Sequence, residues 1–329
     1  MAPASERRAI RRVLICLDRS PLSEACLPHA AFLARTFGSA ITLLLVMQPP
    51  HDIASRPTDA LGWEIARQEA ISYLERFEKQ YFGHAIDVRL EQGRPAERIA
   101  AVEREIGADL IVIGGHGEGG VTPWNLGSTA EHVLTLAQGS VFIARGGAGP
   151  GVAFSPQTIL VPLDGSIRAE SVLPSATRMA RANGASLTLV HVVQEAVGTE
   201  ILRAPEDLEL ARELASRLES RAKRYLGRLQ GQLAGEVSSV RTVVLRHGDH
   251  GHALLESSER VRADLVVLSA HGATCNRRHP FGSVTTQFLA HSPLPLLILQ
   301  DLSGADQSRP ATRSDRPPSL RSPSAREMI

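Results

Sequence analysis

Short apolar runs alternate with longer amphipathic segments along most of the chain. In the first half the apolar runs are Val13–Leu17, Ile41–Met47, Ile86–Leu90, Leu110–Gly114 and Val141–Ala144. They are nearly continuous rather than alternating in polarity, which is typical of strands buried on both faces of a parallel sheet. The pattern therefore predicts five strands separated by helices.

The segment after the first strand has the signals of a helix start. Ser20 suits the N-cap, and Pro21 suits the first helical position because its missing N–H would be unpaired there anyway. We expect this helix to run to about Gly38, with a bend at Pro28. Further helices are predicted at Leu61–Tyr81, Pro95–Ile106 and Gly127–Ala137.

The second half repeats the first. Ile15–Ser20 (ICLDRS) resembles Val161–Ser166 (VPLDGS) at an offset of 146 residues, and Ala108–Val112 resembles Ala263–Val267 at an offset of 155. The second copy therefore carries nine extra residues between its second and third strands. This drift is expected of a duplicated domain with one change of length.

Each copy is predicted to be a five-stranded, doubly wound α/β domain of Rossmann-like type with a parallel sheet. The domains are assigned to residues 1–148 and 157–302, joined by a linker at 149–156. Residues 303–329 are rich in Ser, Pro and Arg and are predicted to be a disordered tail. A phosphorylated or partner-binding tail is the functional alternative.

The fifth strand of each copy is expected at a sheet edge. Leu294–Leu299 is entirely apolar, and an uncovered apolar edge invites aggregation. We therefore predict that the two copies pack as a pseudo-two-fold pair through Val141–Ala144 and Leu294–Leu299. A further homodimer of the whole chain is left open.

Composition excludes some classes of function. The chain has 36 basic and 35 acidic residues, so bulk charge does not favour a nucleic-acid binder. The longest apolar stretch, Ala40–Met47, is too short to span a bilayer, and no membrane association is predicted. Three scattered cysteines without a Cys-x-x-Cys motif favour a reducing, cytoplasmic setting.

Candidate ligand-binding residues lie at the predicted carboxyl ends of the strands, where doubly wound sheets bind ligands. Asp18 and Asp164 follow the first strand of each copy, and a glycine-rich loop from Gly114 to Ser128 follows the fourth. Glycine lets the backbone approach a ligand and adopt positive φ, and the helix start after the loop favours an anion such as phosphate. The combination suits a nucleotide.

The loop also carries a family resemblance. Gly114, Gly117, Gly127 and Ser128 fulfil the spacing Gly-x2-Gly-x9-Gly-Ser after an Ala-Asp-Leu-Ile-Val strand, and the first strand ends in Leu-Asp-x-Ser. Together with the duplication, these motifs resemble the universal stress protein family in its tandem two-domain form. The resemblance covers residues 11–146 and 157–300, and it implies an adenine nucleotide alpha hydrolase-like fold.

In the nucleotide-binding branch of that family, the Asp after the first strand contacts adenine and a Val after the second lines the base pocket. The loop glycines and the Ser hold the ribose and the phosphates. The matching positions in the first copy are Asp18, Val46, Gly114, Gly117, Gly127, Ser128 and Thr129. Those in the second copy are Pro162, Asp164, Val192, Gly272, Gly282, Ser283 and Val284.

The resemblance thus implies a stress-response regulatory module that binds ATP, ADP or AMP and acts on an unknown protein partner. Mg²⁺ is expected only through the phosphates. The copies depart from the family pattern in different places. The second has Ser269 where the first has Gly114, and the first has Cys16 where the second has Pro162.

Other functions are not excluded. Slow ATP hydrolysis or phosphoryl transfer is an alternative, although the chain has no Gly-Lys phosphate loop, no Gly-x-Ser-x-Gly elbow and no catalytic residue that we can name. A structural dimerisation module with vestigial sites is a weaker alternative. Neither a metal site at His247, His250 and His252 nor redox sensing at Cys275 is favoured.

Overall fold

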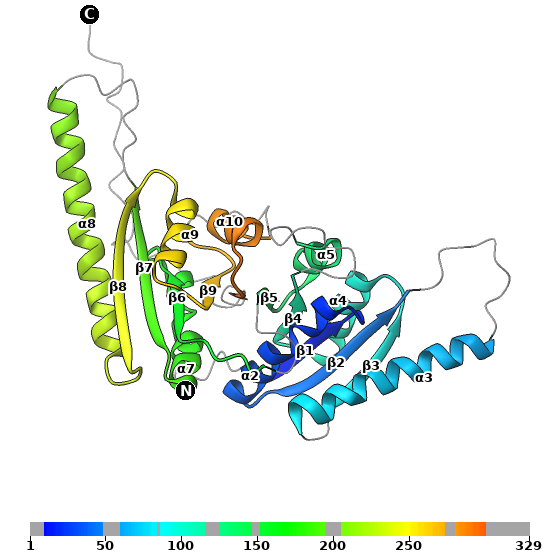
Figure 1. The fold of residues 1–329 in the computed structure, drawn as a ribbon. Helices are drawn as coiled ribbons and strands as arrows, with labels where there is room; N and C mark the ends of the chain where they lie inside the picture. Colours follow the sequence, from blue (N-terminus) through cyan, green and yellow to red (C-terminus); the bar gives the residue numbers. More distant parts are fainter. Residues whose placement is uncertain are drawn as a thin grey trace, which may run out of the picture.

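The computed structural model describes residues 10–48, 60–83, 86–115, 126–146, 152–194, 205–273 and 280–300. Two halves of like architecture lie side by side in it (Figure 1). The predicted tail and part of the predicted linker lie outside the described residues. Among the helices described, none is long and apolar enough to cross a membrane.

Each half alternates strands with helices, as the sequence predicts. The first half contains β1 (Arg12–Leu17), α1 (Pro21–Glu24), α2 (Leu27–Phe37), β2 (Ala40–Met47), α3 (Ala60–Phe77) with a π-helical turn (Glu78–Phe82), β3 (Asp87–Gln92), α4 (Pro95–Ile106), β4 (Leu110–Gly114), α5 (Ser128–Leu136) and β5 (Ser140–Ala144). The second half contains β6 (Thr158–Pro162), α6 (Ile167–Glu170), α7 (Leu173–Asn183), β7 (Ser186–Gln194), α8 (Pro205–Leu233), β8 (Ser239–His247), α9 (His250–Arg260), β9 (Leu265–Ser269), α10 (Ser283–His291) and β10 (Leu296–Leu299).

The strands form one ten-stranded sheet in the order β3-β2-β1-β4-β5-β10-β9-β6-β7-β8. All neighbours are parallel except β5 and β10, which pair antiparallel with Phe142 opposite Leu297. The predicted pseudo-two-fold pairing through the fifth strands is therefore confirmed. Each apolar edge covers the other, which removes the exposed edge from both halves.

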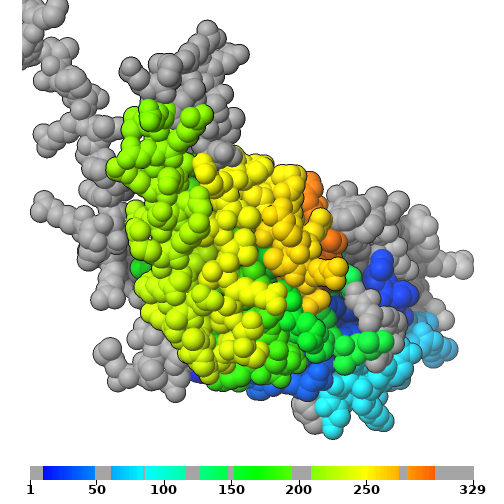
Figure 2. Space-filling view, turned by 60° about the vertical axis from the view of Figure 1, so that its left-hand side comes forward, coloured from blue at the N-terminus to red at the C-terminus, as the bar shows by residue number. Residues whose placement is uncertain are grey.

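Two apolar cores lie on opposite faces of this sheet. Along β1, Val13 and Ile15 face one core, while Leu14 and Cys16 face the other, so the strand is buried on both sides. Helices α2, α3, α7 and α8 cover the first face, and α4, α5, α9 and α10 cover the second. Figure 2 is turned toward the outer side of the second half, where both α8 and α9 are visible at the surface. This layering explains why the strand segments are continuously apolar.

The helix predicted from Ser20 to Gly38 is instead two helices. α1 ends at Glu24 and α2 begins at Leu27, with Pro28 in its first turn. The ring of a proline clashes with the carbonyl four residues earlier and removes a helical hydrogen bond, and here that carbonyl belongs to Glu24. Pro28 therefore breaks the helix rather than bending it. The second half repeats the break, because α6 ends at Glu170, four residues before Pro174.

Arg145 connects the halves where the two fifth strands meet. Its side chain is buried, and its guanidinium donates hydrogen bonds to carbonyls near the C-terminus of α10. The accepting residues are Phe288, Leu289 and Ser292. The helix dipole favours a cation at this end. Arg145 of the first half thus caps a helix of the second.

A second arginine makes the reciprocal contact near the surface. Arg178 of α7 donates from Nε to the Thr36 carbonyl at the C-terminus of α2, at 2.8 Å, and its guanidinium lies 5.3 Å from the ring centre of Phe37. Nearby, His29 of α2 stacks on Phe154, which precedes β6. The interface therefore combines strand pairing, aromatic packing and helix capping in both directions.

Candidate functional site

The sheet order places the predicted site residues at the topological switch point, where the order of the strands reverses. β1 is flanked by β2 on one side and β4 on the other, so the chain moves away from β1 first in one direction and then in the other. Asp18 follows β1, and Gly114 ends β4. Val46 lies near the end of β2, one residue beyond the pairing of Leu17 with Leu45. These three positions meet at the carboxyl edge of the sheet, where such folds bind ligands.

The two ends of the first glycine-rich loop are tied together by backbone hydrogen bonds. Gly127 donates its N–H to the Gly115 carbonyl at 2.9 Å, and Gly115 donates to the Ala144 carbonyl at 2.8 Å. α5 begins after Gly127, and no side chain caps it in the described part of the chain. Ser128 is exposed and Thr129 half-buried in its first turn. Gly117 lies outside the described residues.

In the second half, the carboxylate of Asp164 is fastened by two backbone amides. Oδ1 accepts the N–H of Ser166 at 2.9 Å, and Oδ2 accepts the N–H of Ala273 at 2.6 Å. The second bond joins the end of β6 to the segment after β9, next to Gly272. Asp164 and Gly272, which are 108 positions apart in the sequence, are therefore in contact.

The helix start of the second half is held beside the same contact. Gly282 donates its N–H to the Ala270 carbonyl at 2.8 Å, and Thr285 Oγ1 donates to the Ser269 carbonyl at 2.9 Å. α10 begins after Gly282 without a side-chain cap among the described residues. The other predicted positions lie on the surrounding elements: Pro162 and Val192 are buried, Val284 is half-buried, and Ser283 is exposed.

The glycines that immediately precede α5 and α10 are not held at positive φ. Gly127 has φ −67° and Gly282 has φ −70°, which any residue can adopt, so the expectation of positive φ is wrong at these two positions. A Cβ at Gly115 would instead lie 3.0 Å from Cγ of Arg145. Positive φ occurs one residue after each aspartate, at Arg19 (φ 70°) and Gly165 (φ 83°).

A repeated Tyr–Glu–Arg group beside each aspartate was not anticipated from the sequence. In the first half, Arg76 of α3 pairs with Glu24 of α1 at 3.7 Å, and its guanidinium lies 5.5 Å from the ring centre of Tyr73. The Tyr73 hydroxyl is buried beside the Glu24 carboxylate. Burial, together with the nearby carboxylates of Glu24 and Asp18, raises the pKa of Tyr73.

The second half has the same group. Arg228 pairs with Glu170 at 3.3 Å and lies 5.7 Å from the ring centre of Tyr225, whose hydroxyl is buried in the same way. The two glutamates are 146 positions apart, but the tyrosines and arginines are 152 apart. The repeat could have been found in the sequence, because the offset of 152 lies between the offsets of 146 and 155 that relate the other repeated segments. Because Pro28 and Pro174 end α1 and α6 at these glutamates, the same proline break positions the group in both halves.

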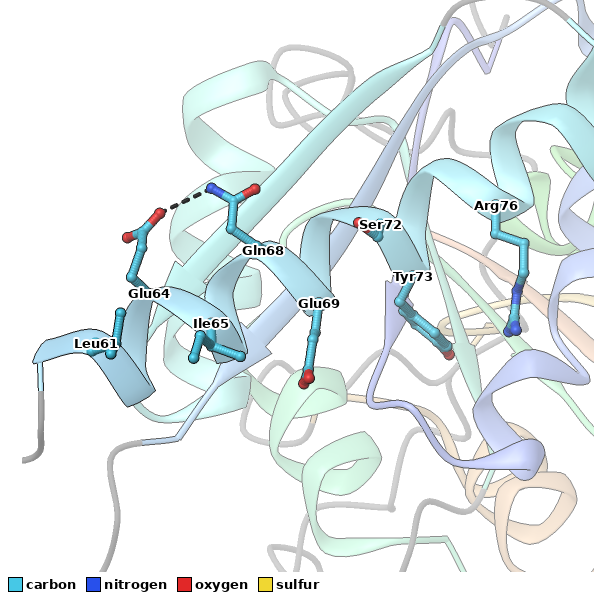
Figure 3. A pocket seen from close by; sticks show the side chains of 8 residues that line it. All are labelled: Leu61, Glu64, Ile65, Gln68, Glu69, Ser72, Tyr73 and Arg76. Atoms are coloured by element: carbon cyan, nitrogen blue, oxygen red, sulfur yellow. Dashed lines mark hydrogen bonds between the residues drawn. The ribbon is translucent and has the colours of Figure 1, made fainter.

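An open cavity of about 570 Å³ runs along α3 and reaches the first of these groups. Figure 3 shows its lining on one helix, with Glu64 hydrogen-bonded to Gln68 near one end and Tyr73 and Arg76 near the other. The lining residues are Leu61, Glu64, Ile65, Gln68, Glu69, Ser72, Tyr73 and Arg76. None of the predicted nucleotide-binding residues that the structure describes lines it.

The histidines of the second half do not form a metal site. No group of three potential ligands occurs within the described residues. His247 and Asp249 bond to each other through Nδ1 and the backbone, and His252 pairs with Glu256 at 3.4 Å. Cys16 is buried, which raises the pKa of its thiol, while Cys275 lies outside the described residues.

Comparison with known proteins agrees with this architecture. A model of the universal stress protein family matches residues 9–145 and 156–300. Universal stress protein MJ0531 of Methanocaldococcus jannaschii is 27% identical over 139 residues, which are 41% of this chain and 82% of that protein.

Solved structures match over nearly the whole chain. A universal stress protein from Archaeoglobus fulgidus superposes with a TM-score of 0.62 at 18% identity and covers 89% of this chain and 99% of its own. The functionally unknown protein PA1789 from Pseudomonas aeruginosa gives 0.62 at 14% identity, over 91% of this chain and 95% of its own. At these identities the likeness concerns the fold alone, but the family match covers both halves. The chain belongs to the universal stress protein family and carries two tandem copies of its domain.

Proposed function

We propose that the chain binds adenine nucleotide, with ATP as the leading candidate, in the crevice at the carboxyl edge of each half. In this proposal, Asp18 and Asp164 accept a hydrogen bond from the adenine amino group. Val46 and Val192 line the base pocket, and the backbone of the glycine-rich loops holds the phosphates. Mg²⁺ accompanies the nucleotide through its phosphates alone.

The observation that carries the proposal is the meeting of distant elements in the second half. Asp164 is in contact with Gly272, while Gly282 bonds to Ala270 of the same segment at the start of α10. A carboxylate and a helix start without a side-chain cap therefore lie together at the carboxyl edge of the second half, and N–H groups at a helix start favour anions. The first half offers the same elements at Asp18 and Gly127.

We further propose a regulatory role, in which the bound nucleotide changes the interaction with a protein partner. The aspartates that follow β1 and β6 accept hydrogen bonds from backbone amides, which suits them to a role as fixed acceptors rather than as general bases. This favours a binding module over an ATP-hydrolysing enzyme. Turnover of ATP above that of a binding-deficient variant would reverse the preference.

Calorimetric titration with ATP and Mg²⁺ tests the proposal, with two equivalents per chain expected at saturation. Gly127→Val should remove one equivalent, because the added side chain fills space beside the first phosphate position while φ −67° accommodates valine. Gly227→Val is the matched control, since nothing lies within 4 Å of a Cβ on that exposed face of α8. No binding by the unmodified chain, or unchanged stoichiometry in Gly127→Val, would contradict the assignment.

A further inference from the structure

The carboxylate assigned to adenine in the second crevice already has backbone partners. Asp164 accepts the Ser166 N–H at Oδ1 and the Ala273 N–H at Oδ2, and we call this pair of bonds the Asp164 fastening. The Ser166 bond lies within the turn that follows β6. The Ala273 bond spans 109 positions and holds the segment that begins the second loop.

The approach of the two segments is unusually close. A Cβ built on Gly272 would lie well under 3.0 Å from Oδ2 of Asp164, a distance that real Cβ atoms essentially never show. Backbone therefore occupies the space beside Oδ2 that a base would need. The side chain is nevertheless exposed at the edge of the sheet, where an incoming ligand can reach it.

We propose that the Asp164 fastening competes with the nucleotide, so that ATP enters the second crevice only by displacing the Ala273 N–H from the carboxylate. This inference rests on the nucleotide binding proposed above. The ligand's amino group replaces the backbone amide as donor to the same carboxylate. Recognition of the base thereby releases Gly272 and Ala273 from the end of β6.

The energetic consequence is a weakened affinity at this crevice. The fastening is a hydrogen bond to an ionised acceptor, and such bonds are stronger than neutral ones. ATP has to break the Ala273 bond before its own hydrogen bond to the Asp164 carboxylate can form, so the cost of the broken bond is subtracted from the free energy of binding. A variant that lacks the fastening should therefore bind ATP more tightly at the second crevice, by about tenfold if about 1.4 kcal/mol is recovered.

Two glycines provide a matched pair of variants. In Gly272→Ala, the methyl group collides with Oδ2 and forces the carboxylate and the segment apart. In Gly231→Ala, on the exposed face of α8, nothing lies within 4 Å of the new methyl, so the fastening stays intact. Ala273→Pro removes the donor itself and provides an independent second variant.

The test combines calorimetry with amide exchange measured by NMR, using ATP with Mg²⁺ as the probe. Calorimetry is done in the Gly127→Val background, so that heat arises from the second crevice alone. The Ala273 amide should exchange slowly in the free chain and quickly at saturating ATP. Gly272→Ala and Ala273→Pro should bind ATP about tenfold more tightly than the background, while Gly231→Ala should keep both the affinity of the background and the slow Ala273 exchange.

Two outcomes separate this inference from the proposal beneath it. If the second crevice fills with ATP while the Ala273 amide remains protected, or if Gly272→Ala and Ala273→Pro both bind no more tightly than the background, the competition is refuted and nucleotide binding stands. If the unmodified chain takes up no ATP in either crevice, both proposals fail.

Discussion

Replacement of Arg145 tests how the two halves are held together. Arg145→Met keeps much of the side-chain volume but removes every donor at the C-terminus of α10. Of the three accepting carbonyls, that of Phe288 also accepts the Ser292 N–H at 3.0 Å, whereas no other donor is described for those of Leu289 and Ser292. Leaving two buried acceptors unpaired costs about 2–6 kcal/mol.

A gain opposes this loss. Arg145 is 5% exposed, and burial lowers the pKa of its guanidinium to about 10, which shows that the buried charge is unfavourable. Replacing it with an apolar group recovers part of the desolvation cost. The favourable helix-end interaction is lost at the same time, at about 0.3–1 kcal/mol, or up to about 2 in buried geometry. We expect the unpaired carbonyls to dominate, with a net loss of about 2 kcal/mol in the free energy of unfolding.

Arg178→Met is the matched control. Arg178 also crosses between the halves and caps a helix, but it is exposed and makes a single hydrogen bond to Thr36. Its loss should cost about 0.5 kcal/mol. Urea unfolding followed by circular dichroism measures both variants. An Arg145→Met chain as stable as the unmodified one, or two variants with equal losses, would refute the reasoning from burial.

Three further predictions concern stability. Burial lowers the pKa of His29 to about 4, so the unfolded chain binds the proton first as pH falls. The free energy of unfolding should therefore drop by about 2 kcal/mol between pH 7 and pH 5. Urea unfolding of His29→Phe at the two pH values provides the check, because this variant should lack that part of the pH dependence. Arg19 has φ 70°, so Arg19→Gly should be at least as stable as the unmodified chain in thermal unfolding. Arg19→Val should be about 1–2 kcal/mol less stable than the unmodified chain, and equal stability of the two would contradict the backbone strain. Tyr73→Phe removes a buried hydroxyl that lies beside the Glu24 carboxylate, and this carboxylate keeps Arg76 as a partner, so urea unfolding should show a loss of no more than about 1 kcal/mol, and a larger loss would contradict this reasoning.

The strands could be predicted because burial on both faces makes each of them a continuous apolar run. β4 begins at Leu110 and ends at Gly114 as predicted, and α4 likewise spans Pro95–Ile106. The pairing of β5 with β10 was predicted from the apolar character of Leu294–Leu299, although the strand begins at Leu296. The hydrophobic pattern was therefore sufficient to predict most of the strands and helices.

Details that depend on sterics between distant segments could not be obtained in the same way. Pro28 indicates that the helix is disturbed near Glu24, but a proline can either bend a helix or break it, and the sequence does not distinguish the two. The approach of Asp164 to Gly272 depends on how two strand ends meet in space. The sequence named both residues as candidates, but it did not indicate that the Asp164 carboxylate is bonded to the backbone N–H of Ala273.

The central claim is that adenine nucleotide occupies the crevices of this chain, and mass analysis of small molecules released from the purified protein on denaturation tests it most directly. The account predicts that ATP, ADP or AMP is released by the unmodified chain, with less released by Gly127→Val and an unchanged amount by Gly227→Val. Absence of any adenine nucleotide from the released fraction, together with no ATP uptake on subsequent incubation with Mg²⁺, would contradict it.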